Sequence, residues 1–324
     1  MNASSYLKHR KIKSSEDTKN VIQIALIAIV LMVIAAILSK GVFLQPRNLM
    51  NLIFQNGILI LIALAQLLVI IVSGIDLSVG AIMAMSSILI VLYQDAGSGA
   101  AILIALGASM VFGAVSGSLV TFKRLPSFVV TLAMMQIVYS LAQVLSGGAA
   151  VYSGFQGATI SEGFTTYYLG SVMGIPNVIL TCIIVIILVS RFLRTSYGHF
   201  AYAIGGNEKT AYFSGIPVER VKVTVYILAA LLAGLAAVIF VGRVGMGDPR
   251  AGQWLPLDSI AAVTIGGASL SGGVGSVAGT VIGVLILGTL TNIMNLMGVP
   301  PTIQPAVKGI VIILAVYLNS RKKN

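Results

Sequence analysis

Residues 52–72, LIFQNGILILIALAQLLVIIV, contain no charged side chain. A helix needs about 20 apolar residues to cross the hydrocarbon core of a bilayer, so this stretch is typical of a membrane span. The whole chain shares this character, because 57% of its 324 residues are hydrophobic and only 9% are charged. Soluble domains carry about a quarter of their residues as charged side chains, so this chain has too few to cover a water-facing surface. We therefore predict an all-α integral membrane protein.

The same criteria predict ten spans and one transmembrane domain, from 20 to 319, between tails at 1–19 and 320–324. The spans lie near residues 20–39, 52–72, 76–93, 100–121, 126–146, 176–193, 222–242, 258–270, 275–297 and 303–319. Residues 147–174 are too polar to span and are expected outside the membrane. The first apolar run resembles a secretory signal, but Lys40 follows it where small residues would precede a cleavage site, which favours an uncleaved span.

The basic residues predict the orientation of the chain. With a cytoplasmic N-terminus, fifteen Lys and Arg fall on the cytoplasmic side and four on the other, while Lys308 falls within the last span. This excess follows the positive-inside rule and predicts that both termini are cytoplasmic. The net charge of +11 is therefore a topology signal, and its short clusters do not form the continuous basic face that nucleic acid requires.

Two halves of the chain carry similar helix starts. Residues 74–81, GIDLSVGA, open the third span, and residues 257–262, LDSIAA, open the eighth. Residues 125–128, LPSF, and 300–303, PPTI, likewise open the fifth and the tenth. On the predicted topology the partners start on opposite sides, which favours an inverted repeat of spans two to five and seven to ten. Asp-x-Ser and Pro-Ser are also common helix starts, so chance similarity remains an alternative.

Asp76 and Asp258 are acids at membrane depth, where a charge is costly and often functional. Each lies at a predicted helix start, where a carboxylate caps free N–H groups and meets the positive end of the helix dipole. We expect structural caps, with substrate contact and proton coupling as the alternatives. Lys308 is expected to snorkel to the interface or to pair with a carboxylate.

The residues that usually carry catalysis or nucleotide binding are missing from the sequence. His9 and His199 lie in cytoplasmic segments without a catalytic partner, Cys182 is alone, and no metal site or enzyme activity is expected. No G-x-x-x-x-G is followed by the Lys of a phosphate-binding loop. Gly275, Gly279 and Gly283 instead recur every four residues, a spacing that lets helices pack closely in lipid.

Amides and hydroxyls within the spans are suited to line a path for a neutral polar solute, and interhelical hydrogen bonding is the alternative for each. They are Asn51, Gln55, Asn56, Gln66, Thr131, Gln136, Tyr139, Asn292, Asn295 and Gln304. A sugar needs such hydrogen-bond partners together with an aromatic face.

The longest cytoplasmic connection, residues 194–222, is expected to contain a short helix. Asn207 is suited to cap it, Glu208 favours its first turn, and Gly215 is suited to end it. Such a helix would expose Ala211, Tyr212 and Phe213, as a docking surface for a motor subunit or as a helix lying on the membrane.

Three motifs resemble the ribose-type permeases of bacterial ABC sugar importers, within the branched-chain amino acid and ribose permease superfamily. They are GIDLSVG at 74–80, YAIGGNE at 202–208 with SGI at 214–216, and IAAVTIGGASLSGG at 260–273. The similarity continues to Lys308 and omits only the N-terminal tail and the external excursion. Val263-Thr264 departs mildly from a pair of valines that is frequent in the family.

The resemblance implies a type II-like permease fold of ten helices that imports a monosaccharide such as ribose across the bacterial cytoplasmic membrane. It implies a second permease copy or a sister permease, an extracytoplasmic sugar-binding protein, and an ATPase subunit whose two domains bind ATP and Mg. The family's coupling loop matches Gly205, Gly206, Asn207, Glu208, Tyr212, Phe213 and Gly215. Permeases for nucleosides, autoinducers or branched-chain amino acids remain alternatives, as does an ion-coupled secondary transporter.

Overall fold

The computed structural model describes residues 3–152 and 162–321, which are mostly helical. The α-helices are α1 (Ala3–Leu38), α2 (Pro46–Ile71), α3 (Val79–Leu92), α4 (Ser98–Phe122), α5 (Ser127–Ser146), α6 (Glu162–Leu169), α7 (Asn177–Leu193), α8 (Ser196–Gly206), α9 (Glu208–Phe213), α10 (Val218–Val244), α11 (Leu255–Ile265), α12 (Val277–Leu296) and α13 (Gln304–Arg321). Two short 3-10 helices are η1 (Val42–Leu44) and η2 (Gln94–Ala96). Four two-residue strands form two antiparallel pairs, β1 (Val151–Tyr152) with β4 (Met246–Gly247) and β2 (Ser171–Val172) with β3 (Ile175–Pro176).

Six helices in the described part of the chain are long and apolar enough to cross a membrane. They are α1 from Val21 onward, α2, α4, α5, α10 and α12, and the pair α7–α8, bent by 70°, would make a seventh. The predicted spans at 76–93 and 258–270 form the short helices α3 and α11. A helix rises 1.5 Å per residue, so their 14 and 11 residues are too few to cross the core alone. A helix lies at each of the ten predicted positions, but the count of ten spans is not confirmed.

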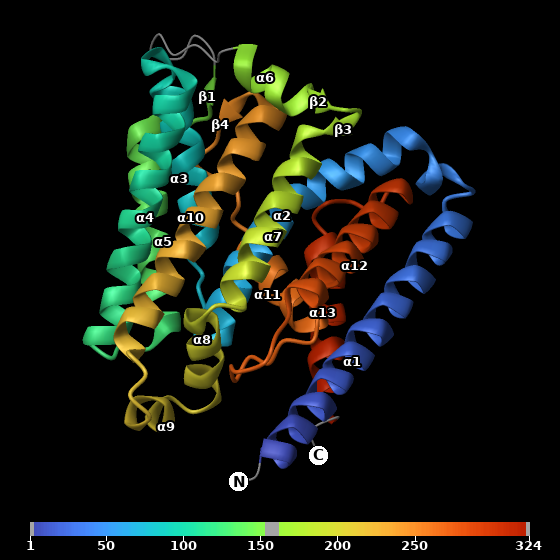
Figure 1. Ribbon diagram of the computed structural model, residues 1–324. Helices are drawn as coiled ribbons and strands as arrows, with labels where there is room; N and C mark the ends of the chain where they lie inside the picture. The colour runs from blue at the N-terminus through green and yellow to red at the C-terminus, as the bar shows by residue number, and fades with distance from the viewer. Residues whose placement is uncertain (1–2, 153–161, 322–324) are drawn as a thin grey trace.

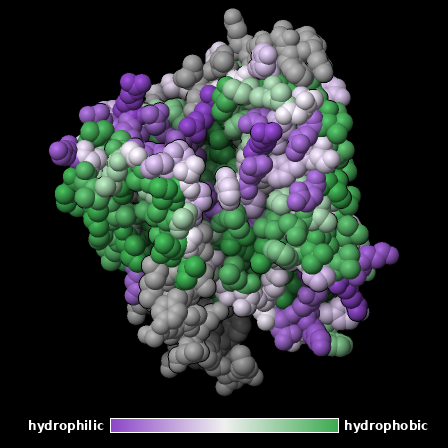
Figure 2. Space-filling view, turned by 180° about the vertical axis from the view of Figure 1, so that it is seen from behind, coloured by the Kyte–Doolittle hydropathy of each residue, from purple (hydrophilic) through white to green (hydrophobic). Residues whose placement is uncertain are grey.

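The ends of the bundle differ in what they carry. Both chain termini and α9 lie at one end, and α6 and β1 lie at the other (Figure 1). α1 begins at Ala3, so the predicted N-terminal tail continues into the first span as one helix. Figure 2 shows broad apolar flanks, with hydrophilic residues gathered toward the two ends and around a hollow in the upper half. The surface is thus apolar where lipid would contact it.

α2 forms the centre of the bundle. Its side chains from Leu61 to Ile71 are buried on every side, in contact with α7, α10, α11 and α12. A helix that is apolar all round is suited to such a position, because no face of it needs water. This uncharged, span-like segment is therefore enclosed by protein, whereas the more apolar first span, Val21–Leu38, is mostly exposed.

Helices of each half of the chain pack against helices of the other half. α10 packs against α3 and α4, and α2 packs against α11 and α12, as expected for an inverted repeat of α2–α5 and α10–α13. Small residues allow both contacts, since Gly113 on α4 faces the α10 backbone at Tyr226 and Gly288 on α12 faces the Asn56 side chain on α2. Within the second half, Gly283 on α12 faces the α11 backbone at Ala262. Gly275 lies before α12, so the expected face of three glycines on one helix has two.

Replacing Gly283 with Ala is expected to separate α11 from α12, because the new Cβ would overlap the carbonyl oxygen of Ala262. Overpacking of this kind costs about 1–3 kcal/mol. We expect the purified Gly283→Ala variant to have a lower midpoint of thermal unfolding than the unchanged protein. The midpoint is measured by size-exclusion chromatography of samples heated to increasing temperatures. Gly107→Ala on α4 is the matched control, since a Cβ there meets nothing within 4 Å and the midpoint should stay or rise. Equal midpoints for the two variants would contradict this account of the packing.

Candidate functional site

The backbone between α2 and α3 leaves helical geometry in the interior of the bundle, and side chains from neighbouring helices bind it there. The Ile75 N–H donates to Ser127 Oγ (3.1 Å), and the Ile75 carbonyl accepts from Thr131 Oγ1 (3.0 Å). The Gln66 amide, in the orientation that satisfies both its atoms, donates to the Asp76 carbonyl (2.9 Å) and accepts from the Asp76 N–H (3.2 Å). Gln66 and Thr131, two of the predicted pathway residues, therefore hold this break in place.

The two acids at membrane depth have different partners. Asp76 is buried two residues before Ser78, the N-cap of α3, and its Oδ1 accepts from the Ser78 N–H (2.8 Å) and the Ser78 hydroxyl (2.6 Å). It thus binds the residue that precedes the helix, and its role as a structural cap stays a prediction. Asp258 lies within the first turn of α11, after an N-cap at Trp254, and its Oδ2 accepts from Lys308 Nζ at 2.7 Å. The expected cap at Asp258 is thus replaced by an ion pair that joins α11 to α13, and Lys308 pairs with a carboxylate.

The other predicted pathway residues do not converge on one site. Asn292 exchanges two hydrogen bonds with Asn48 (3.0 and 2.9 Å), and Gln304 donates to Asn295 (2.8 Å). Gln136 lies exposed on α5, and Tyr139 is buried with a hydroxyl that has no partner among the described residues. Their role as pathway lining stays a prediction.

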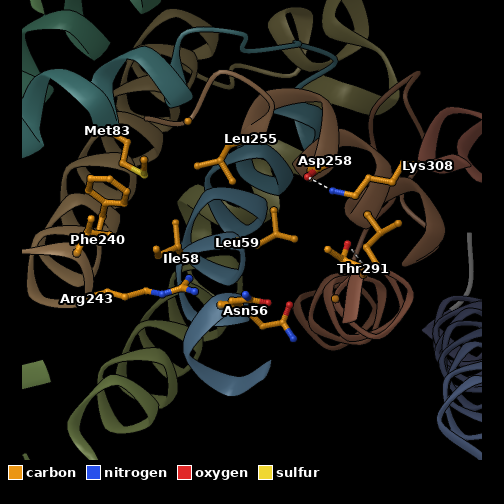
Figure 3. Close-up of a pocket in the computed structure, with 15 residues that line it drawn as sticks. Asn56, Ile58, Leu59, Met83, Phe240, Arg243, Leu255, Asp258, Thr291 and Lys308 are labelled. Atoms are coloured by element: carbon orange, nitrogen blue, oxygen red, sulfur yellow. Dashed lines mark hydrogen bonds and ion pairs between the residues drawn. The ribbon is translucent and has the colours of Figure 1, made fainter. Parts of the chain in front are cut away.

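Asn56 lines a cavity of about 320 Å³ between α2, α3, α10, α11, α12 and α13. Arg243 and Thr291 line it as well, and the Asp258–Lys308 pair forms part of its wall (Figure 3). Sequence analysis treated Arg243 only as a topology signal and did not single out Thr291. One signal in the sequence could have pointed to Arg243. It is a cation in the last turn of a span whose neighbours are apolar, and it follows the aromatic Phe240 by one turn.

The connection between α7 and α10 contains two capped helices. Thr195 caps α8 by accepting from Gly198 N (3.4 Å), and Asn207 caps α9 by accepting from Thr210 N (2.9 Å). Glu208 in the first turn pairs with Lys222 on α10 at 2.9 Å, and Gly215 follows α9 with φ +79°. The short helix expected from the sequence is therefore present.

α9 presents two aromatic side chains outward. Tyr212 is 59% and Phe213 is 85% exposed, and their rings meet edge to face. Ala211 is only 3% exposed and faces the body of the protein, so the expectation that it is exposed is wrong. A helix of six residues has one inner and one outer face, and Ala211 lies on the inner one.

α8 joins this segment to the centre of the bundle by contacts between backbones. A Cβ at Gly205 would overlap the carbonyl oxygen of Ile71 at the end of α2. The Ser73 hydroxyl, in the break after α2, lies 3.1 Å from the Gly205 carbonyl and 2.8 Å from the Ser271 carbonyl and shares its proton between them. The Gly273 N–H donates to the Ile71 carbonyl (3.0 Å). One junction thus connects α8, the α2–α3 break and the loop between α11 and α12.

A crevice of about 810 Å³ runs beside this junction. Tyr212, Lys209 and Arg124 line its outer part, and Ser73 and Gly74 line its inner part. It therefore connects the exposed face of α9 with the break in the interior. Within residues 3–152 and 162–321, no three His, Cys, Asp or Glu side chains are grouped to hold a metal ion.

Comparisons with known proteins agree on one kind of relative. The family model described as branched-chain amino acid transport system / permease component matches residues 48–316. The chain is 43% identical to the ribose import permease protein RbsC of Bacillus subtilis, over 90% of both chains. It is 35% identical to the L-arabinose ABC transporter permease protein AraH of Azospirillum brasilense, over 92% of this chain and 88% of the relative. It is 36% identical to the D-allose transport system permease protein AlsC of Escherichia coli, over 90% and 89%. No solved structure matches.

Lys308→Met should destabilise the protein, because it leaves the Asp258 carboxylate unpaired in the interior. Removing one partner of a buried pair costs about 3–5 kcal/mol, and we expect somewhat less here because both side chains keep 18% exposure. The double variant Asp258→Leu/Lys308→Met replaces both with apolar groups of similar size and should recover most of the loss. Thermal unfolding of the purified variants gives the comparison. A double variant as unstable as the single one would show that the pair is not what links α11 to α13.

Proposed function

Because the chain belongs to the family of permease components of branched-chain amino acid transport systems, we propose that it is the membrane-spanning subunit of an ATP-driven importer for a monosaccharide. Ribose is the first candidate, since the relative with 43% identity is a ribose import permease. Permease subunits of this kind are not enzymes, and the free energy for transport comes from ATP hydrolysis on another subunit.

The exposed aromatic pair on α9 carries this proposal. Tyr212 and Phe213 project from a helix that is capped by Asn207 and tied by Glu208 to α10. Exposed large apolar side chains on a rigid element are typical of docking surfaces. A nucleotide-driven subunit that pulls on these rings would move α8, and α8 contacts the α2–α3 break directly through Gly205.

The two cavities suit a pathway with access from either side. The crevice at Tyr212 reaches Gly74 from the end of the bundle with α9, and the cavity at Asn56 lies toward the opposite end. The buried middle of α2 and the α2–α3 break lie between them. A movement of α8 against the break would change which side has access.

We propose three partners on the same grounds. An ATPase subunit with two nucleotide-binding domains binds ATP and Mg and docks on α9, and an extracytoplasmic sugar-binding protein delivers the solute at the other end. A second copy of this chain or a sister permease completes the pathway. The assembly lies in the cytoplasmic membrane of a bacterium, with both termini of this chain in the cytoplasm.

Reconstitution of this chain with its ATPase and binding protein in proteoliposomes tests the proposal. We expect uptake of labelled ribose that needs ATP inside, Mg and all three components. Arabinose, xylose, allose and leucine serve as comparison solutes. Uptake of leucine in place of the sugars would reassign the substrate class, and uptake by this chain alone under a proton gradient would refute ATP-driven import.

Phe213→Ser should abolish most ATP-driven uptake and uncouple the ATPase from delivery of the solute, with little change in stability, because the ring is 85% exposed. Tyr93→Ala is the matched control, an exposed aromatic residue at the far end of α3. It should keep at least half of the uptake. The measurement is the initial rate of uptake together with co-purification of the ATPase. Normal uptake by the Phe213→Ser variant would contradict the assignment of α9 as the docking surface for the ATPase.

A further inference from the structure

The cavity at Asn56 lies between six helices, away from α9. Its lining comes from the first half of α2, from α3, from the last turns of α10 and α12, and from the first turns of α11 and α13. A volume of about 320 Å³ falls at the lower end of the range of about 300–1,000 Å³ for small-molecule sites. The cavity is thus sized for a small solute and placed at the end opposite the proposed motor.

Asn56 is a buried amide with an unused donor. The residue is 3% exposed, and its Nδ2 has no hydrogen-bond partner among the described residues. A buried donor without a partner costs about 1–3 kcal/mol, so such groups usually have a partner that is not part of the chain. Gly288 on α12 leaves the room for this side chain, since a Cβ there would overlap the Asn56 amide. The amide is therefore held in position at the cavity wall.

Charged groups on the other walls add donors and an acceptor. Arg243 extends into the cavity on the same side as Asn56 (Figure 3), and no ion pair binds it within the described chain. Lys308 engages Oδ2 of Asp258, which leaves Oδ1 as an acceptor. Hydrogen bonds to charged groups are stronger than those between neutral groups. The cavity offers donors and acceptors on facing sides, as a polyhydroxylated ligand requires.

The remaining wall is apolar. Phe240 and Met83 lie opposite the Asp258–Lys308 pair, with Leu255, Ile58 and Leu59 between them (Figure 3). A sugar ring has C–H faces that pack on such a surface while its hydroxyls point to polar groups. Lys308 and Asp258 neutralise each other, and Arg243 adds one positive charge to the lining. The free Oδ1 of Asp258 would still repel an anionic group near it, so we expect a neutral ligand to bind better than an anionic one.

We propose that this cavity binds the transported monosaccharide within each permease subunit. Asn56 and Arg243 donate to its hydroxyls, Asp258 accepts from one of them, and Phe240 covers a ring face. This assignment rests on the proposed importer function and adds to it a site inside one chain. It makes Asn56 and Arg243 residues that determine specificity.

Equilibrium binding of labelled ribose to the complex of permease and ATPase in nanodiscs, without binding protein, tests the site. Asn56→Leu keeps the size of the side chain and removes the amide, and Arg243→Met removes the guanidinium. Loss of one such hydrogen bond should weaken binding about tenfold in each variant. The thermal midpoint of Asn56→Leu should stay or rise, because an unpaired buried donor is lost; a role in folding alone would lower it.

Thr289→Val is the matched control. Thr289 is also buried on the same side of the bundle, its hydroxyl has no partner among the described residues, and it does not line the cavity. Its binding of ribose should equal that of the unchanged protein. Tighter binding of ribose 5-phosphate than of ribose would overturn the neutral class of ligand.

Uptake assays on the same variants separate the two proposals. If the full assembly takes up ribose with ATP but the unchanged complex does not bind it, or Asn56→Leu and Arg243→Met bind it normally, the site is wrong and the importer function stands. If the full assembly takes up none of ribose, arabinose, xylose and allose, the importer function for these sugars fails, and the site proposal falls with it.

Discussion

Backbone groups inside a bilayer must find hydrogen-bond partners within the protein, and this requirement shapes the centre of the structure. α2 stops at Ile71 while still enclosed, so Ile75 and Asp76 in the break depend on side chains for their backbone hydrogen bonds. Ser127 and Thr131 on α5, and Gln66 on α2 itself, supply the partners. The break is therefore stable only inside the assembled bundle. It is also where α8 makes contact, so the least regular backbone in the interior lies next to the segment proposed to move.

The exchange of partners between the halves follows from the same requirement. α3 and α11 are too short to span, and each has polar backbone near its start that only other helices can cover. α10 packs against α3, and α2 packs against α11. Glycines on α4 and α12 allow these helices to come close to α10 and α11. Close approach of backbones replaces the hydrophobic effect, which does not drive helices together in lipid. Neither half is complete without the other.

Features that depend on local sequence were predictable. The apolar runs placed all the long helices, and the Asp-x-Ser motif placed the start of α3. Asn207 and Gly215 bounded the short helix that contains Tyr212 and Phe213. The sequence did not predict which face of each helix packs against its neighbours, because a span that is apolar all round has no periodic pattern of polar residues. Asn56, Arg243 and Lys308 are far apart in sequence, and only the crossing of α2, α10 and α13 brings them to one cavity. The burial of Ala211 likewise depends on how α9 lies against its neighbours.

The hydrogen bond from the Gly273 N–H to the Ile71 carbonyl, and those from the Ser73 hydroxyl to the Gly205 and Ser271 carbonyls, have a consequence for the synthesis and membrane insertion of the chain. Ser73 and Ser271 are 198 residues apart, so the ribosome delivers the first long before the second exists. Until then the carbonyl of Ile71 at the end of α2 lacks the N–H of Gly273, and Ser73 lacks one of its two acceptors. The first half of the nascent chain must therefore stay near the insertion machinery, or in contact with the interfacial water, while the second half is synthesised. A chain truncated after α10 would retain most of the apolar segments and still leave this polar site open, which makes it a substrate for membrane quality control.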